Sequence, residues 1–202
     1  MKQSPAHMTY HWWKYLLVLA ASTLVWMVVF DSLGQPAKNE KIRISYFGEQ
    51  LALETMEKDF IQILPSLTHQ TIEKVTVENP IGTITADYHA VLTSRIYGAD
   101  FIIIEESVLA ETVGNTYFLP LPVDALEDRL LELTFYTEND VPFGILLNGL
   151  DTVFSSYYSG DEKCYLFITH TSVNMAGIMG TGSAEDDAAL KLIEYLLENN
   201  ND

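Results

Sequence analysis

Acidic and aromatic residues stand directly after two segments that have the composition of β-strands. Ile42 to Phe47 is β-branched and aromatic, and Phe101 to Ile104 is a continuous apolar run. In parallel α/β sheets, ligands bind at the carboxyl ends of the strands. Carboxylates and aromatic ring faces together suit a cationic ligand. The predicted ligand-binding residues are therefore Tyr46, Phe47, Gly48, Glu49, Glu105, Glu106 and Ser107.

Two segments of the sequence, Glu106 with Ser107 and a glycine-rich run near the C-terminus, have competing interpretations. Glu106 and Ser107 are also placed to cap the short helical stretch predicted from Val108 to Val113. The run Gly177 to Gly182 precedes a helix and offers backbone amides to an anion, but it lacks the Lys-Ser or Lys-Thr ending of a P-loop. Acidic residues at 185–187 already occupy the positive end of that helix dipole, so we interpret the run as a loop.

The sequence indicates no catalytic or metal-binding residues. Cys164 is the only cysteine, which excludes an intramolecular disulfide and a cysteine-rich zinc site. Its place in an apolar run predicts a buried strand residue rather than a reactive thiol. His170 precedes Thr171 and Ser172, but no nucleophile elbow G-x-S-x-G is present. We therefore predict no enzyme activity, metal or cofactor, and an extracellular hydrolase is the weakest hypothesis.

The charge of the chain excludes one class of partner. The formal net charge is −17, and residues 1–30 contain two lysines and no acid, so the other 172 residues carry 9 basic and 28 acidic residues, a balance of −19. Such a field repels phosphate backbones, so we predict no nucleic-acid binding. The simplest interpretation of the acids is that they keep a domain soluble outside the cell.

The segment from Trp12 to Phe30 predicts a transmembrane helix. Its nineteen residues are apolar except for Lys14, Ser22 and Thr23, and about 20 are needed to cross a bilayer. The segment is not followed by the small residues of a signal-peptide cleavage site. Serine stands at position 22, where a lipoprotein box would need cysteine. We therefore expect a permanent single-pass anchor in the cell membrane.

The orientation of this anchor is predicted from its place in the chain rather than from charge. Lys2 and Lys14 precede the segment or lie at its start, while Lys38, Lys41 and Arg43 follow it, so the positive-inside count does not decide. A short tail before one apolar segment is the usual signal-anchor arrangement. We therefore place the N-terminus in the cytoplasm and the C-terminal domain outside it.

Strand and helix patterns alternate after the linker and predict an α/β fold. Strands are expected at 42–47, 75–77, 101–104, 143–147 and 164–168, with helices at 53–64, 88–96, 126–133 and 190–197. This order favours a single lobe with a largely parallel sheet flanked by helices. The predicted parts are a cytoplasmic tail (1–11), the transmembrane helix (12–30), a linker (31–41), the domain (42–198) and a tail (199–202).

The order of elements resembles the bacterial extracellular solute-binding protein superfamily. Five segments carry the resemblance: 42–48 with its helix, 96–104, 114–121, 142–146 and 190–198. The resemblance implies a shortened, membrane-anchored periplasmic-type binding protein without a second lobe. Such a module would recognise a small solute or a neighbouring membrane protein such as a transporter permease. The alternative is a non-enzymatic structural or interaction protein that kept this fold without ligand binding.

A pocket at the strand ends separates these two hypotheses. If Phe47, Glu49 and Glu106 line a deep pocket, solute binding is favoured; if that surface is flat and filled, the structural alternative is favoured.

Overall fold

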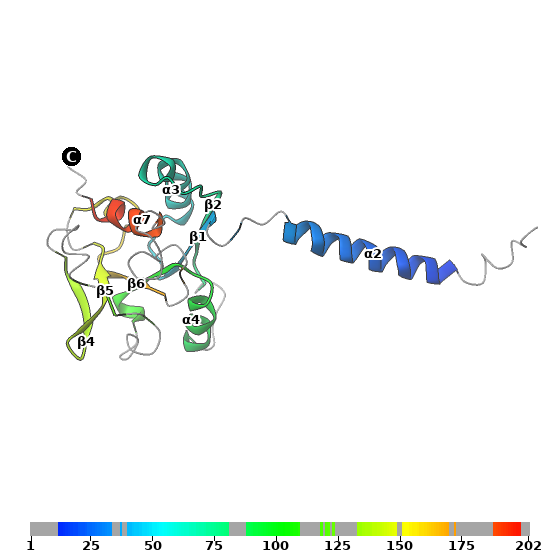
Figure 1. Cartoon of the computed structure of the whole chain (residues 1–202). Helices are drawn as coiled ribbons and strands as arrows, with labels where there is room; N and C mark the ends of the chain where they lie inside the picture. Colours follow the sequence, from blue (N-terminus) through cyan, green and yellow to red (C-terminus); the bar gives the residue numbers. More distant parts are fainter. Residues whose placement is uncertain are drawn as a thin grey trace, which may run out of the picture. The chain divides into compact units, whose positions relative to one another are not determined.

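The computed structural model describes residues 12–33, 37, 40–80, 88–109, 118, 120–121, 123, 133–148, 151–169, 172 and 188–198. The chain forms two compact units, Met1–Pro36 and Ala37–Asp202 (Figure 1). The predicted tails at 1–11 and 199–202, the run Gly177 to Gly182, His170 and nearly all of the predicted helix at 126–133 lie outside the described residues.

The first unit contains one long helix, α2 (Trp12–Leu33). Its stretch Trp12–Phe30 has a mean hydropathy of 1.8 and is long and apolar enough to cross a membrane, and none of it is buried. The hydroxyls of Ser22 and Thr23 both donate to the Leu19 carbonyl at 2.8 Å, so these polar groups are satisfied within the helix. The helix extends three residues into the predicted linker, because Gly34 and Pro36 are the first residues there that disfavour it.

The second unit is built on a six-stranded sheet with the order β2-β1-β3-β6-β5-β4. Its strands are β1 (Lys41–Phe47), β2 (Lys74–Glu78), β3 (Phe101–Glu105), β4 (Phe135–Glu138), β5 (Val141–Leu146) and β6 (Cys164–Ile168). The α/β class and the five predicted strands are confirmed, and β4 is an additional strand. The prediction of a largely parallel sheet is corrected to a mixed sheet: β1 pairs in parallel with β2 and β3, and the pairs β3–β6, β6–β5 and β5–β4 are antiparallel.

A tight hairpin accounts for part of the antiparallel half. Asn139 and Asp140 connect β4 to β5 with φ angles of 51° and 63°. Two consecutive positive φ values are the signature of a type I′ turn, whose twist matches that of antiparallel strands, and Asn and Asp tolerate this conformation best after glycine. The register shifts after Tyr136, which pairs with Gly144, so β5 carries a bulge near Pro142.

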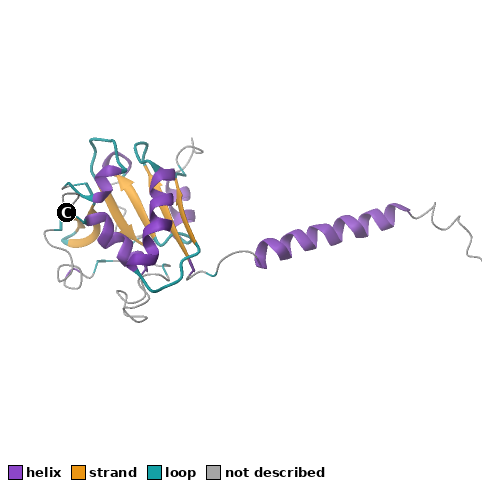
Figure 2. Ribbon diagram, turned by 90° about the horizontal axis from the view of Figure 1, so that it is seen from above, coloured by secondary structure: helices purple, strands orange, loops and turns teal. Residues whose placement is uncertain are grey.

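Alternating side chains place two apolar clusters against the sheet. One cluster joins Ile42, Ile44 and Tyr46 of β1 to the helices α3 (Leu53–Leu67) and α7 (Ala188–Leu197). The other joins Phe47 to α4 (Tyr88–Ile96) and to alternate residues of β3. All five residues of β3 are buried, as expected for a strand covered on both faces. Figure 2 shows the orange strands among these purple helices.

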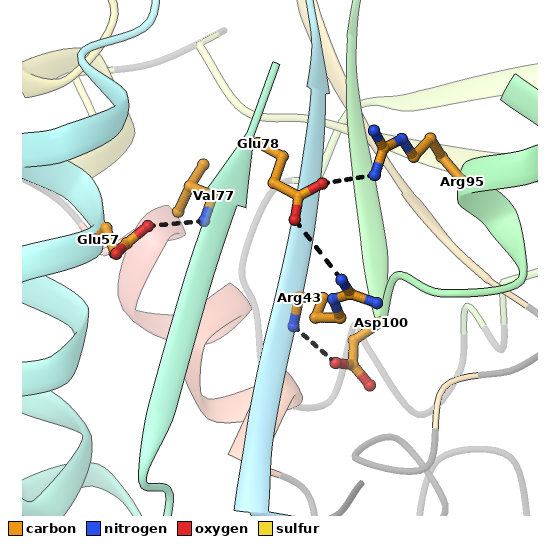
Figure 3. A network of polar contacts seen from close by, with 6 residues as sticks. All are labelled: Arg43, Glu57, Val77, Glu78, Arg95 and Asp100. Carbon is orange, nitrogen blue, oxygen red and sulfur yellow. Dashed lines mark hydrogen bonds and ion pairs between the residues drawn. The ribbon is translucent and has the colours of Figure 1, made fainter. Parts of the chain in front are cut away.

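A network of ion pairs ties α4 to β1 and β2 (Figure 3). Glu78 lies between two arginines, with one carboxylate oxygen 2.6 Å from Arg95 and the other 3.6 Å from Arg43. The Arg43 backbone N–H donates to the Asp100 carboxylate at 2.9 Å, which fixes the start of β3 beside β1. We name Arg43, Glu78 and Arg95 the arginine network.

Glu57 of α3 protects the edge of the sheet. Its carboxylate accepts the backbone N–H of Val77 in the edge strand β2 at 3.1 Å (Figure 3). An edge N–H that is already bonded cannot pair with the strand of another chain.

Candidate functional site

Three segments meet where β1 and β3 end and β6 begins. Residues 48–52 follow β1, the 3₁₀-helix η3 (Glu106–Val108) follows β3, and residues 157–163 precede β6. Backbone hydrogen bonds join the first segment to the third, from Ala52 N–H to the Tyr157 carbonyl at 2.8 Å and from Ser159 N–H to the Gln50 carbonyl at 3.1 Å. The Glu106 N–H donates to the Lys163 carbonyl at 2.8 Å, so the second segment is also held.

These segments enclose an open hollow of about 470 Å³. This volume lies in the range of small-molecule sites, roughly 300–1,000 Å³. We name it the acidic hollow. It is lined by Glu49, Gln50, Glu105, Ser107, Val108, Tyr158, Ser159, Gly160, Asp161 and Glu162.

Glu105 is the buried centre of this site. The residue is 4% exposed, and its Oε1 accepts hydrogen bonds from the Tyr46 hydroxyl and from the Glu49 and Gln50 backbone N–H groups, the last two at 3.2 and 3.4 Å. The Tyr46 oxygen in turn accepts the Gln50 N–H at 2.9 Å. Burial and the bond to Glu105 raise the pKa of Tyr46, so its hydroxyl keeps the proton that it donates. These bonds fix the carboxylate against the turn after β1.

Gly48 is required by this arrangement. A Cβ at this position would collide with the Glu105 carboxyl carbon and with the Tyr46 hydroxyl. The glycine therefore lets the buried carboxylate approach the backbone of the turn.

Tyr158 brings a second hydroxyl to the hollow. Its side chain is 7% exposed, and its ring stacks on Phe154 with centroids 5.7 Å apart. Its hydroxyl oxygen is buried and has no hydrogen-bond partner of good geometry among the described residues. Burial and the nearby Cys164 thiol raise the pKa of Tyr158. A Cβ on Gly160, which also lines the hollow, would collide with this oxygen.

The hollow has a negative formal charge. Four of the residues that line it are acidic and, among the described residues, no lysine or arginine lines it. Glu162 accepts the Ser107 N–H at 3.1 Å. The side chains of Glu49 and Asp161 make no hydrogen bond or ion pair with any other described residue. Lys163 pairs with Glu106 at 3.4 Å instead, and neither of those residues lines the hollow.

The predicted site residues divide between the hollow and other positions. Glu49, Glu105 and Ser107 line it, and Tyr46 and Gly48 support Glu105. Phe47 is fully buried in the cluster with α4, so the structure does not bring it into the hollow. Glu106 is exposed and paired with Lys163.

Glu106 and Ser107 do not stand at the N-cap position of the helix that the structure describes here. Both residues lie within η3, whose N-cap position is Glu105 and has no side-chain capping bond. The described part of the predicted helical stretch is Val108, the last residue of η3, and Leu109, which follows that helix.

Sequence reasoning missed the segment that contributes half of the lining residues, residues 158–162. Its turn-forming and acidic composition before β6 was a usable signal, but only an antiparallel β6 brings the start of that strand to the end of β3.

The remaining groups that could carry chemistry are the Cys164 thiol and the possible metal ligands. Cys164 is fully buried in β6, as predicted, and burial raises the pKa of its thiol to about 12. Within the described ranges, no group of three or more His, Cys, Asp or Glu residues is arranged to hold a metal ion.

No protein-family model matches the chain, and no curated protein or solved structure matches it at a significant level.

Proposed function

We propose that the protein is a membrane-tethered recognition module that binds a small solute in the acidic hollow. The observation that carries this proposal is the hollow of about 470 Å³ that three chain segments form at the ends of β1 and β3. Of the three residues expected to line a pocket here, only Glu49 does so, because Phe47 is buried in the cluster with α4 and Glu106 pairs with Lys163. The sequence resemblance to solute-binding proteins supports the same proposal.

Binding rather than catalysis is the chemistry that these residues support. The buried thiol of Cys164 has a pKa of about 12, so it is not a nucleophile at neutral pH. Glu105 is held by the Tyr46 hydroxyl and two backbone amides, an arrangement that fixes the position of its carboxyl group. The proposed role is non-enzymatic recognition.

Helix α2 is the proposed single-pass anchor, with the second unit outside the cytoplasm. Its apolar stretch Trp12–Phe30 supports the anchor, and the signal-anchor arrangement supports the direction. Protease added to intact cells should digest the second unit, and protease added to the outside of inverted vesicles should not. Protection of that unit in intact cells would reverse the proposed orientation.

The proposed partners of the module are the membrane and a neighbouring membrane protein, such as a transporter permease, that receives the solute. Cross-linking in intact membranes, followed by mass spectrometry, should identify one dominant membrane partner if this part of the proposal holds. Random cross-links to abundant membrane proteins would count against it.

Solute binding is tested by thermal unfolding of the full chain in nanodiscs. A panel of cationic, sugar and peptide solutes should contain at least one that raises the unfolding temperature. Ser107→Trp should abolish this rise because the indole fills the hollow, whereas Ser66→Trp on the exposed surface of α3 should retain it. No stabilisation by any solute, or equal stabilisation of both variants, would contradict binding in the hollow.

A further inference from the structure

The last strand of the sheet leaves backbone hydrogen-bonding groups on its outer side. β4 ends the strand order and pairs with β5 (Figure 1). The Thr134 carbonyl, just before β4, accepts an N–H of β5 at 2.8 Å, and Tyr136 is paired in register with Gly144. Alternate residues of an antiparallel strand turn their backbone groups toward the neighbouring strand. The N–H and C=O groups of Phe135 and Thr137 therefore face away from β5.

Pro142 supports the outward direction of Thr137. The two residues lie opposite each other, and proline has no N–H to donate. In a hairpin with a two-residue turn, the flanking pair, here Glu138 and Val141, exchanges the backbone hydrogen bonds. Thr137 is exposed, and neither it nor Phe135 has a backbone hydrogen bond with a described residue on the outer side. The outer side of β4 is therefore open to another strand.

The two edges of the sheet differ in their protection. On β2, the Glu57 carboxylate accepts the Val77 N–H. On β4, no side chain of a described residue accepts an outward N–H, and the strand contains neither proline nor lysine, which commonly block an edge. Phe135 and Tyr136 are partly buried and pack against opposite faces of the sheet. A further strand beside β4 would bury more of both rings.

We propose that β4 pairs with β4 of a second copy of this chain, antiparallel and around a two-fold axis at Tyr136. This pairing joins two six-stranded sheets into one. In this register Phe135 lies opposite Thr137 of the second copy, and each such pair exchanges both of its N–H···O bonds. All the outward backbone groups of β4 are then satisfied.

The strand is complementary to itself, because its outward residues lie symmetrically on either side of Tyr136. The two tyrosines face each other across the axis, and aromatic cross-strand pairs are favourable. Antiparallel pairing directs the two β4–β5 turns to opposite ends, so Glu138 of each copy lies opposite Thr134 rather than opposite the other Glu138. Like charges directly opposite each other would be destabilising. The proposed anchor also holds the copies in one membrane, which raises their effective concentration.

The inference is independent of solute binding, because no residue of β4 lines the acidic hollow. It is tested with the full chain in phosphatidylcholine liposomes, by energy transfer between copies labelled with donor and acceptor dyes at the C-terminus. Thr137→Pro removes an outward N–H that the fold does not use, and should weaken pairing at least about tenfold, the effect of two lost hydrogen bonds per dimer. Thr137→Ser keeps the N–H and is the matched control.

Cysteine cross-linking tests the register and does not depend on the proline variant. Thr134→Cys chains mixed with Glu138→Cys chains should form a disulfide between copies, because opposite residues that are not hydrogen-bonded have Cα atoms about 4.5 Å apart. Either variant alone should form little, since residues of the same number lie far apart in this register. Cys164 is buried and does not compete.

Three results would overturn the inference. The first is wild-type energy transfer no higher than that of chains mixed at random in the same membrane. The second is unchanged transfer in Thr137→Pro with a wild-type near-ultraviolet circular dichroism spectrum, which would place the contact on another surface. The third is equal cross-linking in the mixture and in the single variants, which alone decides the question if Thr137→Pro does not fold.

Discussion

The arginine network and the acidic hollow use carboxylates in opposite ways. In the network, both oxygens of one carboxylate, Glu78, are paired with guanidinium groups of Arg43 and Arg95. In the hollow, four acidic residues converge, and the nearby Lys163 is paired with Glu106 outside it. Glu78 is therefore paired on both oxygens within the fold, whereas the side chains of Glu49 and Asp161 in the hollow make no ion pair with any described residue.

The two regions also differ in what holds their charges. The side chains of the network are between 33% and 45% exposed, so water screens its ion pairs. Glu105 is buried and held by neutral donors that come from the turn after β1 and from Tyr46. The network should therefore tolerate a substitution with little loss of stability, whereas the Glu105 carboxylate in the hollow is held in one position.

The largest expected difference between the two regions is in the stability that is lost when the central carboxylate is removed. Glu105→Ala should lower the free energy of unfolding by about 3 kcal/mol, because it leaves buried donors unpaired and opens a cavity. Glu78→Ala should cost no more than about 1 kcal/mol. Tryptophan fluorescence would not report on the second unit, because all three tryptophans lie in α2. Urea unfolding should therefore be followed by near-ultraviolet circular dichroism, to which the tyrosines of the second unit contribute. Equal losses in the two variants would contradict the distinction.

The next largest difference in stability is expected between glycine-to-alanine substitutions in the two regions. Gly48→Ala places a Cβ against the Glu105 carboxyl carbon and the Tyr46 hydroxyl, and should destabilise the protein by about 1–3 kcal/mol. Gly98→Ala places a Cβ 3.3 Å from the end of the flexible Arg43 side chain and at an ordinary contact distance of 3.9 Å from the Arg95 carbonyl oxygen, and should be close to neutral. A tolerated Gly48→Ala in the same unfolding assay would show that Glu105 is not fixed as described.

The buried groups behind the hollow predict a fall in stability at high pH. The Cys164 thiol has a pKa of about 12 when folded and 9.0 as an ordinary value, so the folded state binds the proton more tightly. This contribution is fully present below pH 9 and is lost as the pH rises toward 12, with a slope of about 1.4 kcal/mol per pH unit. Tyr46 and Tyr158, whose pKa values burial also raises, add to the fall above pH 10.

Cys164→Ala is the variant that tests this slope. The free energy of unfolding, measured between pH 9 and pH 10, should fall less steeply than in the wild type, even if the variant is less stable at pH 7. An unchanged slope would mean that the thiol does not contribute. The arginine network has no such group, so Glu78→Ala should leave the slope unchanged.

The smallest expected effect on stability is that of Tyr158→Phe. The hydroxyl lies beside the Cys164 thiol and Glu105 but makes no hydrogen bond of good geometry with a described residue, so its removal should leave the urea midpoint nearly unchanged. Tyr46→Phe is the contrast, since the Tyr46 hydroxyl donates to Glu105 and accepts from Gln50, and its loss should cost about 1–3 kcal/mol. A large loss in Tyr158→Phe would reveal a structural bond at that hydroxyl.

Local patterns predicted the strands well, because apolar alternation and β-branched composition arise from each segment itself. The long apolar helix was equally clear, although Leu33 rather than Phe30 ends it. The hairpin residues Asn139 and Asp140 were a recognisable signal for β4 that we did not use.

Only part of the candidate site could be predicted from the sequence. Tyr46 and Phe47 are consecutive in β1, and consecutive strand residues point to opposite faces, so both could not face one site. That rule alone would have removed one of them. The approach of Tyr158 to Glu105 depends on β6 being antiparallel beside β3, a pairing between distant segments that no local pattern encodes.

The proposed difference, that the acidic hollow binds a solute while the arginine network does not, is tested most directly by the affinity for a small cationic solute such as 1,4-diaminobutane. We would measure 1,4-diaminobutane binding by calorimetry in the full chain, in the double variant Glu49→Gln with Asp161→Asn, and in Glu78→Gln. The account predicts at least about a tenfold loss of affinity in the double variant and none in Glu78→Gln. Equal affinity in all three proteins would contradict it.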